Sequence, residues 1–132
     1  MKLEISGFSH VAIRVTDLQR ARRFYVDQLG LPVALEVEGV VLVKTGSGLL
    51  GIRGDAAGAK PGDRFDPHRV GLDHVSFAVD TVELLERMKR DLDAARIPND
   101  GIHDEPALNA KGLVFYDPDG IAIELYTILK RH

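Results

Sequence analysis

The apolar and polar positions of this chain follow one pattern that occurs twice. A glycine lies three residues before a histidine in a segment that begins at Gly7, and again in a segment that begins 64 residues later, at Gly71. Each histidine is followed by valine and then by residues that alternate with period two, which predicts a β-strand in both places. Since alternate side chains of a strand point to opposite faces, His10 and His74 lie on the small and polar faces of their strands. The repeat favours two imidazoles that point into one cleft; exposed or simply hydrogen-bonded strand histidines are the alternative.

The first copy continues with a helix and three strands. Thr16, with Gln19 three residues later, resembles a capping box, and the apolar residues that follow recur at helical spacing. Gly30 is placed to end this helix. Strands are then predicted at 31–37, 40–44 and 49–53.

The second copy follows a segment, 54–70, that is rich in glycine, proline and aspartate. This segment is predicted to be a connecting loop, either a plain linker or a cover over a cleft. A strand over 72–79 precedes a second capping box, Asp80 with Glu83, and a second amphipathic helix. Further strands are predicted at 101–103, 113–116 and 121–126, with a loop at 104–111 and a frayed tail from 130 to 132.

The element order predicts an α+β fold of two tandem βαβββ modules in a single domain, residues 1–132. The first module covers 3–53, the linker 54–70 and the second module 71–128. Each module offers a curved mixed sheet with one helix, and it cannot cover its own concave side. Pairing of the two modules is therefore expected to enclose a cleft.

Composition narrows the functional classes. The chain of 132 residues is 45% hydrophobic and 28% charged, which is ordinary for a soluble globular domain. Its net charge of −3 argues against a nucleic-acid partner and against an anionic membrane. There is no cysteine, and hence neither a disulfide framework nor a thiol nucleophile. The N-terminus lacks the pattern of a signal peptide and no apolar run approaches about 18 residues, so a cytoplasmic location is expected.

The last predicted strand contains a carboxylate among apolar residues. Its odd positions are large and apolar, whereas Ala122, Glu124 and Tyr126 share the other face. A buried carboxylate is costly unless something pairs with it, and a divalent metal ion held together with two neutral imidazoles would do so. Two histidines and one carboxylate suit Fe²⁺, and Mn²⁺, Zn²⁺, Ni²⁺ or Co²⁺ occupy similar sites. A salt bridge at the edge of the sheet is the alternative for Glu124.

The chain resembles the vicinal oxygen chelate superfamily in three features. These are the double βαβββ layout, the histidine on the first strand of each module, and the ending from Phe115 to Gly120 that is followed by Glu124. This superfamily includes glyoxalase I, bleomycin-resistance proteins, fosfomycin-resistance enzymes, methylmalonyl-CoA epimerase and extradiol dioxygenases. The resemblance covers about residues 6–127. It implies that His10, His74 and Glu124 are metal ligands and that the protein forms a homodimer.

Three positions depart from the patterns of particular subgroups, one of them Ala12, where the fosfomycin enzymes have a threonine two residues after the first histidine. Glyoxalase I has a glutamate and the epimerase a glutamine where this chain has Ile52, so a site with three protein ligands is expected. Extradiol dioxygenases and fosfomycin enzymes have a tyrosine ten residues before the ligand glutamate, and here that position is Val114. The resemblance is therefore specific for the fold and less so for the reaction.

No catalytic residue for proton transfer stands out. The candidate substrate-binding residues share the faces of the predicted ligands or lie in the adjoining loop: Arg14, Ser76, Asn109, Lys111, Val114 and Tyr126. The other two histidines considered, His68 and His103, do not repeat between the modules. Both are interpreted as surface residues in loops, although either could line the mouth of the cleft.

Two functional classes remain open. The first is a metal-dependent, glyoxalase-like enzyme: a lyase, isomerase or oxygenase whose metal acts as a Lewis acid on a small substrate with vicinal oxygens. The second is a metal-free protein that sequesters an antibiotic or another aromatic natural product, as bleomycin-resistance proteins do. The histidine and glutamate set favours the enzyme, because sequestration does not need three convergent ligands. An enzyme fold that is retained as an interaction module is a third possibility.

Overall fold

The computed structural model describes residues 1–54 and 60–129, in two compact units, Met1–Asp63 and Arg64–His132. The boundary between the units falls within the predicted linker. Residues 55–59 of this linker and the predicted frayed tail, 130–132, lie outside the described residues. Each unit has one four-stranded sheet.

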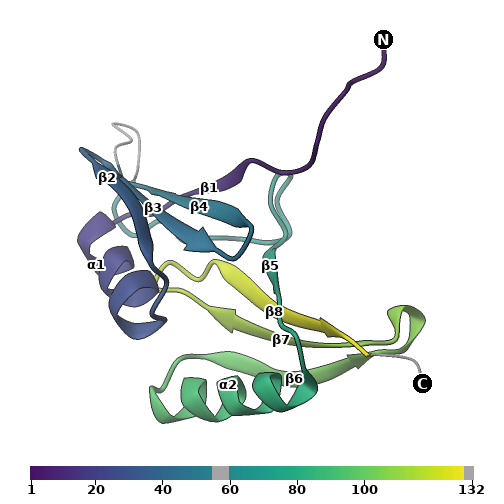
Figure 1. Cartoon of the computed structure of the whole chain (residues 1–132). Coiled ribbons are helices and arrows are strands. Elements are labelled where there is room, and N and C mark those ends of the chain that lie inside the picture. Colours follow the sequence, from purple (N-terminus) through teal and green to yellow (C-terminus); the bar gives the residue numbers. More distant parts are fainter. Residues whose placement is uncertain (55–59, 130–132) are drawn as a thin grey trace. The chain divides into compact units, whose positions relative to one another are not determined.

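The first unit forms a mixed sheet with one helical segment (Figure 1). Strand β1 runs parallel to β4, whereas β4 with β3 and β3 with β2 are antiparallel, which gives the order β1-β4-β3-β2. The elements are β1 (His10–Arg14), α1 (Leu18–Arg22), the π-helical η1 (Arg23–Gln28), β2 (Val33–Val37), β3 (Val40–Thr45) and β4 (Gly48–Arg53).

The second unit repeats this topology. Strand β5 runs parallel to β8, the remaining pairs are antiparallel, and the order is β5-β8-β7-β6. The elements are β5 (Val75–Ala78), α2 (Val82–Ala94), β6 (Asn99–Glu105), the 3₁₀ turn η2 (Pro106–Leu108), β7 (Ala110–Tyr116) and β8 (Ala122–Ile128). The α+β fold of two βαβββ modules is thereby confirmed.

Both helices begin one residue later than the capping-box pattern predicts. The cap of α1 is Asp17 and not Thr16, and the cap of α2 is Thr81 and not Asp80. In each case the cap residue has extended backbone angles, and its side-chain oxygen accepts the backbone N–H three residues later at 3.1 Å. In both helices, therefore, the last extended residue before the helix is the cap, and its side chain satisfies a free N–H of the first turn.

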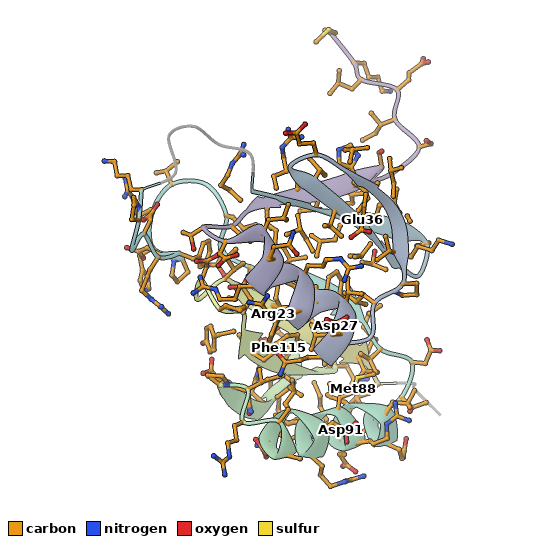
Figure 2. The ribbon with its side chains drawn as sticks, turned by 90° about the vertical axis from the view of Figure 1, so that its left-hand side faces the viewer. Arg23, Asp27, Glu36, Met88, Asp91 and Phe115 are labelled. Atoms are coloured by element: carbon orange, nitrogen blue, oxygen red, sulfur yellow. The ribbon has the colours of Figure 1, made fainter. Side chains whose placement is uncertain are left out.

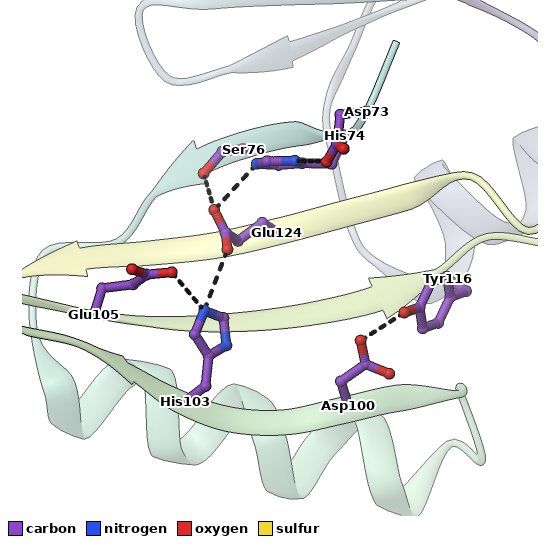
Figure 3. Close-up of polar contacts among 8 residues, drawn as sticks. All are labelled: Asp73, His74, Ser76, Asp100, His103, Glu105, Tyr116 and Glu124. Atoms are coloured by element: carbon purple, nitrogen blue, oxygen red, sulfur yellow. Dashed lines mark hydrogen bonds and ion pairs between the residues drawn. The ribbon is translucent and has the colours of Figure 1, made fainter. Parts of the chain in front are cut away.

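Helix α2 is amphipathic and packs against β6, β7 and β8. Leu85 and Leu92 are buried in this contact, as is Phe115 of β7, whereas Asp91 is exposed (Figure 2). Figure 3 shows α2 behind this sheet, so that the opposite face of the sheet is left for polar side chains. The helix thus decides which face of the second unit can carry a functional site.

The register of the strands sorts the residues of the second unit onto these two faces. Val75 of β5 pairs with Ile123 of β8, and both are buried, on the face that α2 covers. Ser76 pairs with Glu124, and Val114 of β7 pairs with Glu124 from the other side. The alternation read from the sequence is confirmed here, and Glu124 lies in the middle of the face that α2 leaves uncovered.

Candidate functional site

Glu124 lies at the centre of a polar cluster on this face (Figure 3). Its side chain is only 11% exposed, and a carboxylate that is so buried needs polar partners. The Oε1 oxygen accepts a hydrogen bond from the Ser76 hydroxyl at 3.0 Å and lies 3.4 Å from Nε2 of His74. The Oε2 oxygen lies 3.7 Å from Nε2 of His103. Two imidazoles therefore approach the two oxygens of one carboxylate.

His74 is held by the residue before it. Its Nδ1 lies 2.6 Å from Oδ1 of Asp73, a carboxylate that can only accept hydrogen bonds. The ring proton therefore lies on Nδ1, and in the neutral imidazole Nε2 presents a lone pair toward Oε1 of Glu124. Two such acceptors repel each other at 3.4 Å unless a proton or a cation lies between them.

His10 has a related partner in the first unit. The hydroxyl of Ser9 lies 2.9 Å from Nδ1 of His10. In both modules, the side chain directly before the histidine engages Nδ1, so that Nε2 is the nitrogen left for another ligand. An imidazole that binds a metal through one nitrogen is usually oriented through the other in this way.

The donor atoms of His74 and Glu124 fit neighbouring ligands of one divalent ion. Two ligands at about 2.1 Å from an ion, in octahedral or tetrahedral geometry, lie about 3.0 to 3.4 Å from each other. The observed separation of 3.4 Å lies within this range. Across residues 1–54 and 60–129, no group of three or more histidine, aspartate and glutamate side chains is arranged to hold a metal ion. The ligand set His10, His74 and Glu124 therefore stays a prediction, of which the structure brings two members together.

His103 belongs to this cluster. It lies in a strand, as the strand predicted over 101–103 implies, and its interpretation as a surface residue in a loop is wrong. It lies in β6, opposite Gly112 of β7, and its Nε2 is 3.5 Å from Oε1 of Glu105 as well as 3.7 Å from Glu124. The sequence of β6 lacks a regular apolar alternation, so the sequence does not show which face His103 occupies or that it lies beside Glu124. The glycine in β7 was the one available signal, because a strand glycine often marks a close approach of a neighbouring group.

Gly112 makes the contact between His103 and Glu124 possible. A Cβ atom at position 112 would lie 2.6 Å from Cε1 of His103 and 2.9 Å from Oε2 of Glu124. Both distances are shorter than van der Waals contact, so any larger residue would push the imidazole away from the carboxylate. The absence of a side chain at this point keeps the space between the two groups open.

A cavity of about 330 Å³ opens on the same face, a volume at the small end of ligand pockets. Its lining residues are His74, Ser76, Glu105, Leu108, Glu124 and Tyr126. The Tyr126 hydroxyl is buried and has no hydrogen-bond partner among the described residues. Burial raises the pKa of Tyr126, and the carboxylates of Glu105 and Glu124 raise it further. The hydroxyl therefore keeps its proton and is available as a donor to a ligand.

Three of the candidate substrate-binding residues lie on the face of Glu124. Ser76 and Tyr126 line the cavity, and Val114 pairs directly with Glu124 across the β7–β8 ladder. The carboxylate thus has the hydroxyl of Ser76 on one neighbouring strand and the apolar side chain of Val114 on the other.

The other candidates are placed differently. Lys111 points to the opposite face of β7, and its Nζ lies 2.5 Å from Oδ1 of Asp104. Asn109 has a left-handed backbone with φ 50°, and its side-chain amide donates to the carbonyl of Leu129. Arg14 belongs to β1 in the first unit. In the second unit, therefore, the structure gives Lys111 and Asn109 structural partners and does not bring them to the cavity.

Known proteins share this fold, with 26 to 27% sequence identity. The chain is 27% identical over 127 residues to YwkD of Bacillus subtilis, in an alignment that covers 92% of this chain and 97% of YwkD. A glyoxylase/bleomycin resistance protein/dioxygenase domain from Frankia superposes with a TM-score of 0.77 at 26% identity, covering 98% of this chain and 96% of the domain. A lactoylglutathione lyase from Agrobacterium tumefaciens superposes with a TM-score of 0.73 at 26% identity, covering 93% and 94% of the two chains.

Membership of a family follows from a match along the sequence. The model of the glyoxalase/bleomycin resistance protein/dioxygenase superfamily matches residues 7–125, from the glycine before the first histidine to the residue after Glu124. Within the described part of the chain, the structure has no helix long and apolar enough to span a membrane. The chain belongs to the glyoxalase/bleomycin resistance protein/dioxygenase superfamily, as the resemblance in its sequence predicts.

Proposed function

We propose that this protein is a metal-dependent enzyme of the vicinal oxygen chelate type, a lyase, isomerase or oxygenase with a small substrate that has two neighbouring oxygens. The proposed ligands of a divalent ion are His10, His74 and Glu124. Similarity to a lactoylglutathione lyase supports the reaction class, and the family to which the chain belongs includes enzymes. The proposal also includes a cytoplasmic homodimer.

One observation carries the proposal. Nε2 of His74 and Oε1 of Glu124 both present lone pairs, and they are separated by the distance expected for two ligands of one ion. When bound, a divalent ion would supply Lewis-acid charge to the two oxygens of the substrate. Asp73 keeps the ring proton of His74 on Nδ1, and Ser76 holds Oε1 of Glu124. These partners orient the ligands before an ion binds, which reduces the cost of binding it.

The cavity supports a small substrate. Its volume of about 330 Å³ suits a compact molecule, and the hydroxyl of Tyr126 offers a hydrogen bond to a substrate oxygen. The side chain of Leu108 adds an apolar wall. A buried donor without a protein partner costs free energy unless a ligand or water accepts its hydrogen bond. A substrate oxygen is proposed to fill this role.

The test is the metal content of the full chain, purified without a chelator and measured by elemental analysis. About one equivalent of Fe, Mn, Ni, Co or Zn is expected, and the variants His10→Ala, His74→Ala and Glu124→Gln should each lose it. The matched control is His68→Ala, which removes an exposed imidazole elsewhere in the second unit. Iron would direct the search toward ring cleavage, and the other metals toward lyase or isomerase reactions.

Addition of divalent ions gives a second measurement. A ligand at one hundred times its Kd stabilises the folded state by about 2.7 kcal/mol, which a thermal melt detects easily. Absence of bound metal, together with no stabilisation by any added ion, would exclude the metal-dependent enzyme.

Metal-free binding of a natural product is the second candidate. A protonated His74 would form an ion pair with Glu124 at 3.4 Å, and this arrangement satisfies the carboxylate without a metal. The apolar side of the cavity, with Leu108 and the ring of Tyr126, would then contact an aromatic ligand. This function predicts that the protein contains no metal and that it binds aromatic antibiotics in equilibrium dialysis equally well with and without a chelator.

A further inference from the structure

We infer that His103 is a positioning residue for Glu124: its imidazole holds the Oε2 oxygen and thereby presents Oε1 on the side of His74. The inference rests on the proposed metal site and adds to it a residue outside the three proposed ligands. It concerns only contacts within the second unit, where all of these side chains lie.

The surroundings of His103 make it a proton donor at Nε2. This nitrogen lies 3.5 Å from Oε1 of Glu105 and 3.7 Å from Oε2 of Glu124. Both neighbours are carboxylate oxygens, which only accept hydrogen bonds, so the proton of the imidazole is most stable on Nε2. His74 has the opposite arrangement, because Asp73 keeps its proton on Nδ1. One imidazole thus offers a lone pair to an ion, and the other offers an N–H group to the carboxylate.

Nε2 of His103 can form a hydrogen bond to Oε2 of Glu124 after a small movement when an ion binds. A direct N–H···O hydrogen bond is about 2.9 Å long, so Nε2 must approach Oε2 by roughly 0.8 Å from its present 3.7 Å. The side chain of His103 is 38% exposed, so the protein does not enclose it on all sides. Gly112 leaves the space for it, since a Cβ there would overlap the ring.

Holding Oε2 limits how Glu124 can bind an ion. With one oxygen engaged by an N–H donor, the carboxylate binds through the other oxygen alone, in the orientation that Ser76 also supports. Hydrogen bonds to ligating groups typically contribute 10- to 100-fold to metal affinity. Loss of the His103 imidazole should therefore weaken binding of the ion without abolishing it.

The experiment is a titration of the metal-free full chain with Co²⁺, with a competing chelator to measure Kd and visible absorption to report the coordination. His103→Ala is expected to bind one equivalent of Co²⁺ about 10- to 100-fold more weakly, with a changed visible spectrum because both oxygens of Glu124 become available. His103→Gln, whose amide N–H occupies the place of Nε2, should restore most of the affinity and the spectrum. His68→Ala is the matched control and should behave as the unsubstituted protein.

The possible results separate the inference from the proposed function. Unchanged affinity and spectrum in His103→Ala would overturn the inference and leave the metal site standing. Complete loss of Co²⁺ in His103→Ala would also overturn it, since His103 would then be a ligand. Failure of His103→Gln to recover more than His103→Ala would exclude the donor role. No Co²⁺ binding by the unsubstituted protein would overturn the proposed function and the inference together.

Discussion

Gly112→Ala is the substitution whose effect can be worked out most fully from the structure. The new Cβ would lie 2.6 and 2.8 Å from Cε1 and Nε2 of His103 and 2.9 Å from Oε2 of Glu124. Gly112 does not have a left-handed backbone, so alanine itself is compatible with the strand. The cost of the substitution therefore comes from side-chain overlap and not from backbone strain.

The magnitude follows from two opposing effects. Overpacking of this kind costs about 1 to 3 kcal/mol, and the reduced freedom of the unfolded chain returns about 0.4 to 1 kcal/mol. The expected net loss is about 1 to 2 kcal/mol in the free energy of unfolding. In a His103→Ala background the two closest contacts are absent and only the contact of 2.9 Å with Oε2 of Glu124 remains, so Gly112→Ala should then cost about 1 kcal/mol less. The coupling between the two sites should therefore be about 1 kcal/mol.

The assay is urea unfolding of the four variants of this double-mutant cycle, followed by far-ultraviolet circular dichroism with a chelator present. The chelator removes any contribution of a bound metal to the stability. Gly51→Ala is the control, because its Cβ would make ordinary contacts, 3.5 Å from Leu42 and 3.6 Å from Ala12. Additivity of Gly112→Ala and His103→Ala within about 0.3 kcal/mol would refute the argument that Gly112 makes room for the imidazole.

Three further predictions concern other polar contacts. The hydrogen bond to Asp100 raises the pKa of Tyr116 to about 12. Asp100→Ala should lower this pKa toward 10, which an ultraviolet titration of tyrosinate would measure. The stabilisation from the pair is present below about pH 10 and is lost as the pH rises through 12. The Asp117 carboxylate accepts two backbone N–H groups at 2.9 and 2.8 Å, so Asp117→Ala should lower the free energy of unfolding in urea by about 2 to 4 kcal/mol, and Asp117→Asn by less than half of that. Thr81→Ala should cost about 1 kcal/mol in the same assay and Asp80→Ala less than about 0.5 kcal/mol; the reverse order would contradict the observed helix cap.

Two strands with a regular apolar pattern could be predicted from the sequence almost to their ends, whereas the strand predicted over 72–79 is observed only as β5, Val75–Ala78. The strand predicted over 40–44 is observed as β3, Val40–Thr45, and the one predicted over 121–126 as β8, Ala122–Ile128. The sequence predicts a strand only over 101–103 and a loop over 104–111, whereas β6 spans Asn99–Glu105 and β7 begins at Ala110. Its residues are mostly polar, so the strand forms because its backbone pairs with β7 and not because of its own alternation.

The sequence by itself determined the two repeated modules and the faces of their strands, because alternation with period two is a local property of the chain. That was enough to place Ser76 and Glu124 on one face. The tertiary structure alone decided which distant side chains meet there, since the register between strands depends on the whole sheet. Pairing of β6 with β7 placed His103 beside Glu124 across a glycine and turned Lys111 to the other face.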